Sequence, residues 1–170
     1  MDFKNYIRDI KDFPKEGVVF KDITPLLQDS IALVKAAEEL ASLVENVRID
    51  KVVGMESRGF IFGPMLAQKL QAGFVPVRKP GKLPYMRFSE SFALEYGEDI
   101  LEMHVDAIKE GEKVLIHDDV LATGGTAGAV AKLVERAGGE IIQFNFLLAL
   151  EFLKGRAKIA DWPVRSLISY

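Results

Sequence analysis

The sequence VLIHDDVLATGGTAGA occupies residues 114–129 and joins three kinds of segment. A mostly apolar run leads into two adjacent acids, Asp118 and Asp119, and a turn rich in glycine and threonine follows. This order is typical of a buried strand that ends in a polar turn and continues into a helix. In parallel sheets ligands bind at the carboxyl ends of the strands, so this turn is a candidate binding site.

The rest of the chain repeats this alternation of strands and helices. We expect strands at 51–55, 73–79, 113–119 and 140–150, and helices at 30–44, 60–71 and 125–137. The strand candidates are continuous rather than alternating apolar runs, which indicates burial on both faces of a sheet. The sequence therefore predicts an α/β fold in which helices flank a mostly parallel central sheet.

The signals between these elements are weaker. We expect a short helix at 2–10, irregular structure at 13–27, a long polar loop at 80–91, a short strand at 92–96 and a helix at 99–109. Pro14, Gly17 and Pro25 are the residues that interrupt regular structure in the second of these stretches.

Composition limits the classes of function. With 170 residues, 49% of them hydrophobic, the chain can bury a sizeable core, and we expect one domain over residues 1–170. A formal net charge of −3 is atypical of nucleic-acid binders. Without cysteine and with only two histidines, thiolate and His-rich metal sites are excluded. There is neither a signal-peptide core nor a membrane-spanning apolar run, so we expect a cytoplasmic protein without membrane partners.

The turn at 122–126 has the chemistry of a phosphate site. A Gly-Gly turn that enters a helix presents free backbone N–H groups and the positive end of the helix dipole. Thr123 and Thr126 add hydroxyl donors, while Asp118 and Asp119 can accept hydrogen bonds from a sugar diol. Together these groups suit a ribose 5-phosphate. The alternative is that Thr123 merely caps the helix and the glycines form a turn.

The stretch VLIHDDVLATGGT also resembles the 5-phosphoribosyl-1-diphosphate (PRPP) signature of the type I phosphoribosyltransferases. Further segments are similar, in order and spacing, to the members of that family that act on adenine: FPKEGVVFKDITPLL (13–27), GMESRGFIFG (54–63), RKPGKLP (78–84), LEYG (94–97) and LKGRAKI (153–159). The resemblance implies a single-domain phosphoribosyltransferase fold with a small hood, formed largely by about residues 1–30, and a flexible catalytic loop. It also implies purine salvage, in which adenine and PRPP give AMP and diphosphate.

Residue roles follow from the resemblance. It implies that the sugar hydroxyls contact Asp118 and Asp119, and that the 5-phosphate binds to Ala122, Thr123, Gly124, Gly125 and Thr126. The turn with Ser57 and Arg58 would take the diphosphate, and its Glu56–Ser57 peptide is a candidate for the cis form. Arg78, Lys79 and Lys82 would neutralise diphosphate, and part of their loop would reach a neighbouring subunit in a homodimer. Mg²⁺ would arrive with PRPP and touch Asp118 or Asp119 only through water.

The adenine pocket is also implied by the resemblance. Phe20 would stack on the purine, the carbonyl of Val19 would accept from the exocyclic amine, and the N–H of Lys21 would donate to N1. Glu95, on a segment that closes over the site, would act with Arg58 in catalysis, and Tyr96 would wall the site.

Two departures and two alternatives stay open. His117 stands where the family usually has an apolar residue, and the segment LALEFLKG (148–155) is about two residues shorter than usual. The chain could instead act on guanine, xanthine or orotate, although the strand at 141–150 lacks the lysine that 6-oxopurine enzymes usually offer. It could also be a regulator that senses PRPP with the same fold, which a basic face or an added domain would favour.

Overall fold

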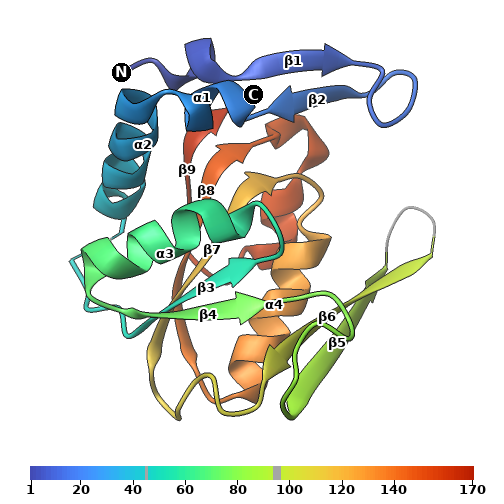
Figure 1. Cartoon of the computed structure of the whole chain (residues 1–170). Coiled ribbons are helices and arrows are strands. Elements are labelled where there is room, and N and C mark those ends of the chain that lie inside the picture. Colours follow the sequence, from blue (N-terminus) through green and yellow to red (C-terminus); the bar gives the residue numbers. More distant parts are fainter. Residues whose placement is uncertain (45, 94–96) are drawn as a thin grey trace.

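The centre of the computed structural model, which describes residues 1–44, 46–93 and 97–170, is a five-stranded sheet (Figure 1). Its strand order is β4-β3-β7-β8-β9 and all neighbours are parallel. The strands are β3 (Lys51–Met55), β4 (Gly73–Val77), β7 (Lys113–Leu121), β8 (Glu140–Ala149) and β9 (Val164–Ser169). The predicted α/β class and the four predicted sheet strands are confirmed, within two residues at their ends.

Helices cover both faces of this sheet. They are α1 (Thr24–Gln28), α2 (Ser30–Ser42), α3 (Gly59–Leu70) and α4 (Gly125–Arg136), with short 3-10 segments η1 (Phe3–Tyr6), η2 (Glu151–Leu153) and η3 (Gly155–Ile159). Leu40 of α2 and Leu66 of α3 pack with Leu115 of β7 in one core, whereas Val130 of α4 packs with Ile116 in the other. Neighbouring residues of β7 thus point to opposite faces, as a pleated strand requires. The three predicted helices of the α/β core are confirmed.

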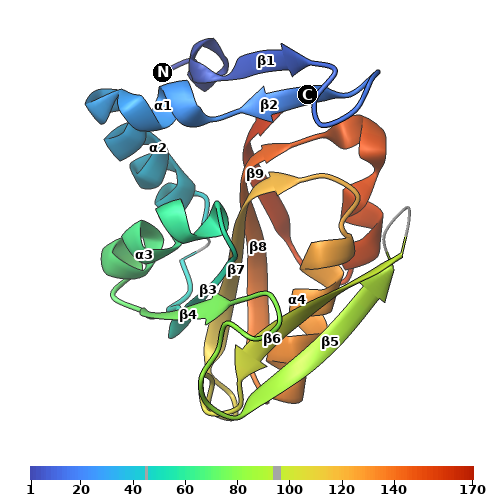
Figure 2. The ribbon, with the colours of Figure 1, turned by 45° about the vertical axis from the view of Figure 1, so that its right-hand side comes forward.

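Two antiparallel hairpins lie outside the central sheet. β1 (Arg8–Lys11) pairs with β2 (Val19–Asp22), and this hairpin lies over the end of the sheet where β8 and β9 finish (Figure 1). β5 (Arg87–Ala93) pairs with β6 (Glu98–His104) and passes beside α4 (Figure 2). The division into one domain with a hood of about residues 1–30 stays a prediction.

Four of the weaker expectations were wrong. Residues 98–104 form strand β6 rather than a helix, because Leu101 and Met103 alternate into the core and the whole segment pairs with β5. The polar loop ends at 86, since β5 begins at Arg87. Residues 2–10 form a 3-10 turn and then a strand, and β2 and α1 interrupt the stretch expected to be irregular. In both hairpins, pairing with the neighbouring strand outweighed local propensity.

Within the described part of the chain, no helix is long and apolar enough to cross a membrane.

Candidate active site

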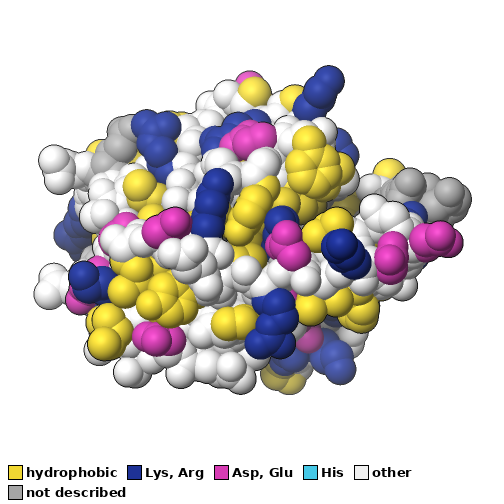
Figure 3. Space-filling view, turned by 90° about the horizontal axis from the view of Figure 1, so that it is seen from above, with side chains coloured by type: hydrophobic (Ala, Val, Ile, Leu, Met, Phe, Trp, Pro, Cys, Tyr) yellow, Lys and Arg dark blue, Asp and Glu magenta, His cyan; other side chains and the backbone are white. Residues whose placement is uncertain are grey.

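A cavity of about 410 Å³ lies at the carboxyl ends of the sheet strands, under the β1–β2 hairpin. It brings together segments that are far apart in the sequence. Its lining consists of Val18, Val19, Phe20, Lys21, Glu56, Ser57, Arg58, Lys79, Phe92, Asp99, Leu101, Asp118, Asp119, Val120, Ala122, Thr126 and Leu150. Seen from above, basic and acidic side chains are interspersed with apolar ones on this end of the molecule (Figure 3). The site is therefore defined by its cavity and not by a face of one charge.

The two adjacent acids line the floor of this cavity at the end of β7. Asp119 is only 4% exposed, and the Oδ1 of Asp118 accepts a hydrogen bond from the backbone N–H of Asp119 at 2.9 Å. Burial raises the pKa of both carboxyls, and the charge of Asp119 raises that of Asp118 further, while Arg58 opposes the rise. A buried acid pair of this kind favours a ligand that brings hydrogen-bond donors or positive charge.

Arg58 bridges the acids and the hairpin. It follows β3 in the Glu56–Ser57–Arg58–Gly59 turn, whose Glu56–Ser57 peptide is cis, as the family resemblance implied. Its Nε lies 2.8 Å from Oδ2 of Asp119, and its guanidinium carbon lies 5.0 Å from the centre of the Phe20 ring. The close approach to Asp119 is an ion pair without hydrogen-bond geometry, because that buried oxygen has no hydrogen-bond partner. Arg58 thus spans the acids and the aromatic ring.

The turn after β7 forms a smaller hollow of about 60 Å³. It is lined by Asp118, residues 120–127 and Phe146. Gly124, with φ of +76°, is the N-cap of α4, and no side chain caps the helix there. Thr123 is therefore not a capping residue, and the first-turn N–H groups stay available to an anion at the positive end of the helix dipole. The geometry favours the phosphate interpretation over that of a simple capped turn.

The other end of the cavity is apolar. Phe20 of β2 meets Phe13 edge to face at 5.2 Å between ring centres, and Val120 and Leu150 add aliphatic surface to the lining. Lys21 directs its side chain elsewhere, with Nζ 2.7 Å from Asp9 and 3.9 Å from the centre of the Tyr170 ring. A flat apolar ring suits this end of the cavity.

The basic loop is only partly at the cavity. The guanidinium of Arg78 donates to Glu56, with Nε at 3.2 Å, and to the carbonyl of Lys82 at 3.3 Å. Glu56 also accepts from the backbone N–H of Lys79, and this bond, ahead of the Arg78 contacts, holds the Glu56 pKa below its usual value. Lys79 lines the cavity and pairs with Asp99, whereas Arg78 and Lys82 do not line it.

Two of the expected residues, Glu95 and Tyr96, lie outside the described residues. The structure also adds lining residues that were not singled out from the sequence: Val18, Glu56, Phe92, Asp99, Leu101, Val120 and Leu150. Glu56 stood within the quoted ESRG turn. Phe92 fell in the strand expected at 92–96, of which 92 and 93 end β5 and 94–96 lie outside the described residues, but Asp99 and Leu101 carried no signal because β6 was expected to be a helix.

His117 lies on β7 beside the acids but faces away from the cavity. It is completely buried and its ring meets Phe62 edge to face, while its contact with Asn145 only partly opposes the effect of burial on its pKa. Burial lowers its pKa to about 4, so the imidazole is neutral at physiological pH. A polar group on a buried strand is what the sequence indicated.

Among the residues that the structure describes, no cluster of three or more His, Cys, Asp or Glu side chains is arranged to hold a metal ion. Asp119 nevertheless has a buried carboxylate oxygen beside the cavity, where it forms the ion pair with Arg58. Carboxylate oxygens and water are ligands that Mg²⁺ prefers, so this residue fits a cation held through water.

Known proteins are similar along the whole chain. The family described as phosphoribosyl transferase domain matches residues 26–167. An adenine phosphoribosyltransferase of Flavobacterium johnsoniae is 61% identical over 170 residues, which is 100% of both chains. The crystal structure of adenine phosphoribosyltransferase from Rhodothermus marinus has a TM-score of 0.94 at 54% identity and covers 99% of this chain and 96% of its own. The Saccharomyces cerevisiae enzyme, complexed with an imino-altritol bisphosphate and adenine, has a TM-score of 0.90 at 42% identity, with 98% and 96% covered.

Proposed function

The chain belongs to the phosphoribosyltransferase family, and we infer that it is an adenine phosphoribosyltransferase, which converts adenine and PRPP into AMP and diphosphate. One observation carries this proposal: the cavity that holds the buried acid pair and the apolar, aromatic end adjoins the hollow at the uncapped N-terminus of α4, and Asp118, Ala122 and Thr126 line both. These features match, in order, the ribose diol, the base and the phosphate of a purine nucleotide.

We assign PRPP to the acidic and glycine-rich part of the cavity. The 5-phosphate accepts from the N–H groups at the start of α4 and from the hydroxyls of Thr123 and Thr126. The sugar diol donates to Asp118 and Asp119. The full set that we assign to PRPP and AMP is Ser57, Arg78, Lys79, Lys82, Tyr96, Asp118, Asp119, Ala122, Thr123, Gly124, Gly125 and Thr126.

Arg58 changes partners in this proposal. Once the sugar diol satisfies Asp119, the guanidinium is released to donate to the oxygens of the departing diphosphate, where its planar fork suits phosphate geometry. Movement of Arg58 away from Phe20 also clears the ring face for the base. The starting position, 2.8 Å from Asp119 and over the ring, supports this exchange.

Adenine occupies the apolar end. Its ring stacks on Phe20, opposite the aliphatic surface of Val120 and Leu150, while the Val19 carbonyl and the Lys21 N–H read its amino edge. An oxo purine would leave the Val19 acceptor facing another acceptor, which costs the desolvation of both groups. This polarity supports adenine over guanine or hypoxanthine.

Catalysis then consists of positioning and charge stabilisation. As diphosphate leaves C1 of the ribose, positive charge develops on the sugar above the acid pair, and negative charge develops where Arg58 donates. N9 of adenine forms the new bond, and we assign Glu95 to accept or hold the proton at the imidazole edge of the base. Asp118 or Asp119 would hold Mg²⁺ through water when the ion arrives with PRPP, and the ion would then neutralise part of the phosphate charge.

We also propose a homodimer that works in the cytoplasm. Tyr85 and Met86, between β4 and β5, are 52% and 62% exposed, and large apolar side chains in solvent are typical of an association surface. Lys82 lies on the same loop, outside the cavity lining, and would serve the neighbouring subunit's site, whereas Arg78 is bound to Glu56 of its own subunit. Sedimentation equilibrium would test this, since a monomer at micromolar concentration would contradict it.

A base-competition assay tests the function. Purified protein is given PRPP and Mg²⁺ with adenine, guanine, hypoxanthine, xanthine or orotate, and nucleotide formation is followed by absorbance. We expect AMP from adenine and little product from the others. Consumption of another base in preference to adenine would contradict the adenine assignment, and PRPP binding without turnover of any base would favour a sensing role.

A further inference from the structure

We propose that Arg156, through its pair with Glu151, is a positioning residue that holds the phosphate turn in its binding conformation. This inference rests on the proposed function, because it concerns the turn assigned to the 5-phosphate. The residue lies in η3, after the last long strand, and lines neither the main cavity nor the hollow at the turn. Its effect on substrate must therefore pass through other residues.

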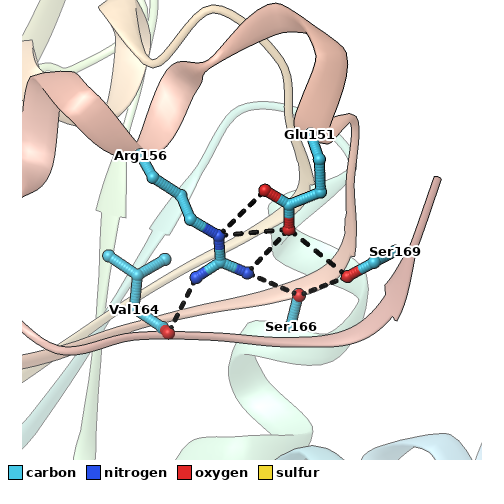
Figure 4. Close-up of polar contacts among 5 residues, drawn as sticks. All are labelled: Glu151, Arg156, Val164, Ser166 and Ser169. Atoms are coloured by element: carbon cyan, nitrogen blue, oxygen red, sulfur yellow. Dashed lines mark hydrogen bonds and ion pairs between the residues drawn. The ribbon is translucent and has the colours of Figure 1, made fainter.

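The guanidinium is fully engaged in a local network (Figure 4). Its Nε donates to both carboxylate oxygens of Glu151 at 3.1 Å, and Nη2 donates to Oε1 at 3.0 Å. The other contacts reach β9: Nη1 donates to the carbonyl of Val164 at 2.9 Å, and Nη2 to the hydroxyl of Ser166 at 3.0 Å. Ser169 completes the ring with a bond to Glu151 at 3.4 Å.

This network joins three elements at one point. Glu151 lies in η2, Arg156 in η3, and the remaining partners in β9. The hydrogen bond from Arg156 holds the pKa of Glu151 below its usual value, so the pair is ionised at neutral pH. Although both side chains are more than a third exposed, a multidentate pair inside a network fixes geometry far better than a single surface contact.

The residue next to Arg156 transmits this position to the turn. Gly155 is buried directly against the turn: a Cβ on it would overlap the carbonyl oxygen of Ala122 and would lie 2.9 Å from the backbone nitrogen of Gly124. In the same way, a Cβ on Gly124 would overlap the carbonyl oxygen of Gly155. The two backbones are in contact, so the place of η3 limits the conformations open to residues 122–126.

The proposed role follows from this contact. If Arg156 loses its partners, η3 can move relative to β9, and the N–H groups of the turn lose the support that aims them at one anion. A misplacement of about 1 Å in a binding group can cost on the order of 100-fold in rate, so even a partial shift is measurable. The base pocket should be affected less, because Leu150 is held by a backbone hydrogen bond to Leu121.

The test compares Arg156→Ala with Arg156→Lys and Glu151→Gln in the full-length protein. We expect Arg156→Ala to raise the KM for PRPP about tenfold while the KM for adenine at saturating PRPP changes little. Arg156→Lys keeps the positive charge without the planar guanidinium, and Glu151→Gln keeps an acceptor without the negative charge. Both variants should therefore raise the KM for PRPP by less than Arg156→Ala does. Lys69→Ala is the matched control, because it breaks an exposed ion pair with Glu38 between α2 and α3.

Two further measurements separate a positioning role from general stability and from the enzyme assignment. Hydrogen exchange should speed up at residues 122–126 in Arg156→Ala, and calorimetry with ribose 5-phosphate should show about tenfold weaker binding even if the protein turned over no base at all. Unchanged affinity for PRPP and ribose 5-phosphate in the folded variant would overturn the inference. So would an equal rise in both KM values with faster exchange throughout the chain, since that describes ordinary destabilisation.

Discussion

Replacement of Asp119 by asparagine should weaken the binding of PRPP and raise the stability of the folded protein. The side chain keeps its shape but loses its charge, and the site places that charge in a buried position beside a second carboxylate. In the ligand-free protein an ionised Asp119 therefore costs free energy, which its ion pair with Arg58 offsets only in part. In the complex, the same carboxylate accepts from the sugar diol.

The two effects have opposite signs. Loss of a hydrogen bond to a charged acceptor costs about 1.5–3 kcal/mol, so PRPP affinity should fall about 10- to 150-fold. Relief of the buried charge should raise the free energy of unfolding by about 1 kcal/mol, which in a chain of this size is a rise in Tm of about 2–4 °C.

The pH dependence of folding stability tests the buried charge of Asp119 independently. Burial raises the folded-state pKa of Asp119 above its unfolded value of 3.8, so the folded protein binds more protons than the unfolded chain between these two pKa values. Wild-type stability should therefore fall as pH rises through that window, and Asp119→Asn should remove that part of the slope.

Calorimetry with PRPP, thermal unfolding from pH 4 to 8 and the exposed control Asp106→Asn form the assay. Unchanged PRPP affinity would refute the contact with the diol. A marked loss of stability would refute the charge argument and indicate instead that the pair with Arg58 holds the fold together.

Three other variants test separate parts of the account. Phe20→Ala should raise the KM for adenine much more than that for PRPP, because stacking is lost at one ligand only; equal rises would indicate a folding defect instead. Glu95→Gln should lower kcat by about 10²–10⁴-fold with little change in PRPP affinity; near-normal kcat with chemistry rate-limiting would remove Glu95 from the mechanism. His117→Val should leave kcat unchanged. The variant should also keep about 3 kcal/mol of the free energy of unfolding that the wild type loses as pH falls from 6.5 to about 4, since only the unfolded chain protonates the imidazole in that range. Parallel pH–stability curves for the two proteins would contradict this.

Four of the five strands of the central sheet could be predicted because they carry their own signal, whereas the edge strand β9 was not predicted. A parallel strand buried on both faces must be apolar throughout, so KVVGM and the run before Asp118 read as strands without further context. A turn at 122–126 could also be predicted from the sequence, since its glycines and threonines limit the backbone conformations that are favourable there.

The second hairpin could not be predicted in the same way. β6 contains Glu98, Asp99 and Glu102 between apolar residues, a local composition that also suits an amphipathic helix. Its strand form depends on β5, and buried Glu102 is compatible with it only because Arg87 and the N–H of Gly81 approach from other elements. The lining residues that these strands contribute were missed for the same reason.

The position of Arg58 over Phe20 shows a second limit of prediction from the sequence. The two residues are 38 positions apart in the sequence and meet only because the hairpin lies over the carboxyl ends of the strands. A motif can indicate that each residue serves the site, but the exchange of partners that we propose for Arg58 requires the three-dimensional arrangement.

A crystal structure of the AMP complex tests the central claim most directly. We predict the 5-phosphate against the backbone N–H groups of residues 123–126, the sugar diol at Asp118 and Asp119, and the adenine ring on Phe20, with Arg58 moved off that ring. AMP bound with its phosphate away from this turn, or with its base outside the cavity beneath the β1–β2 hairpin, would contradict the account.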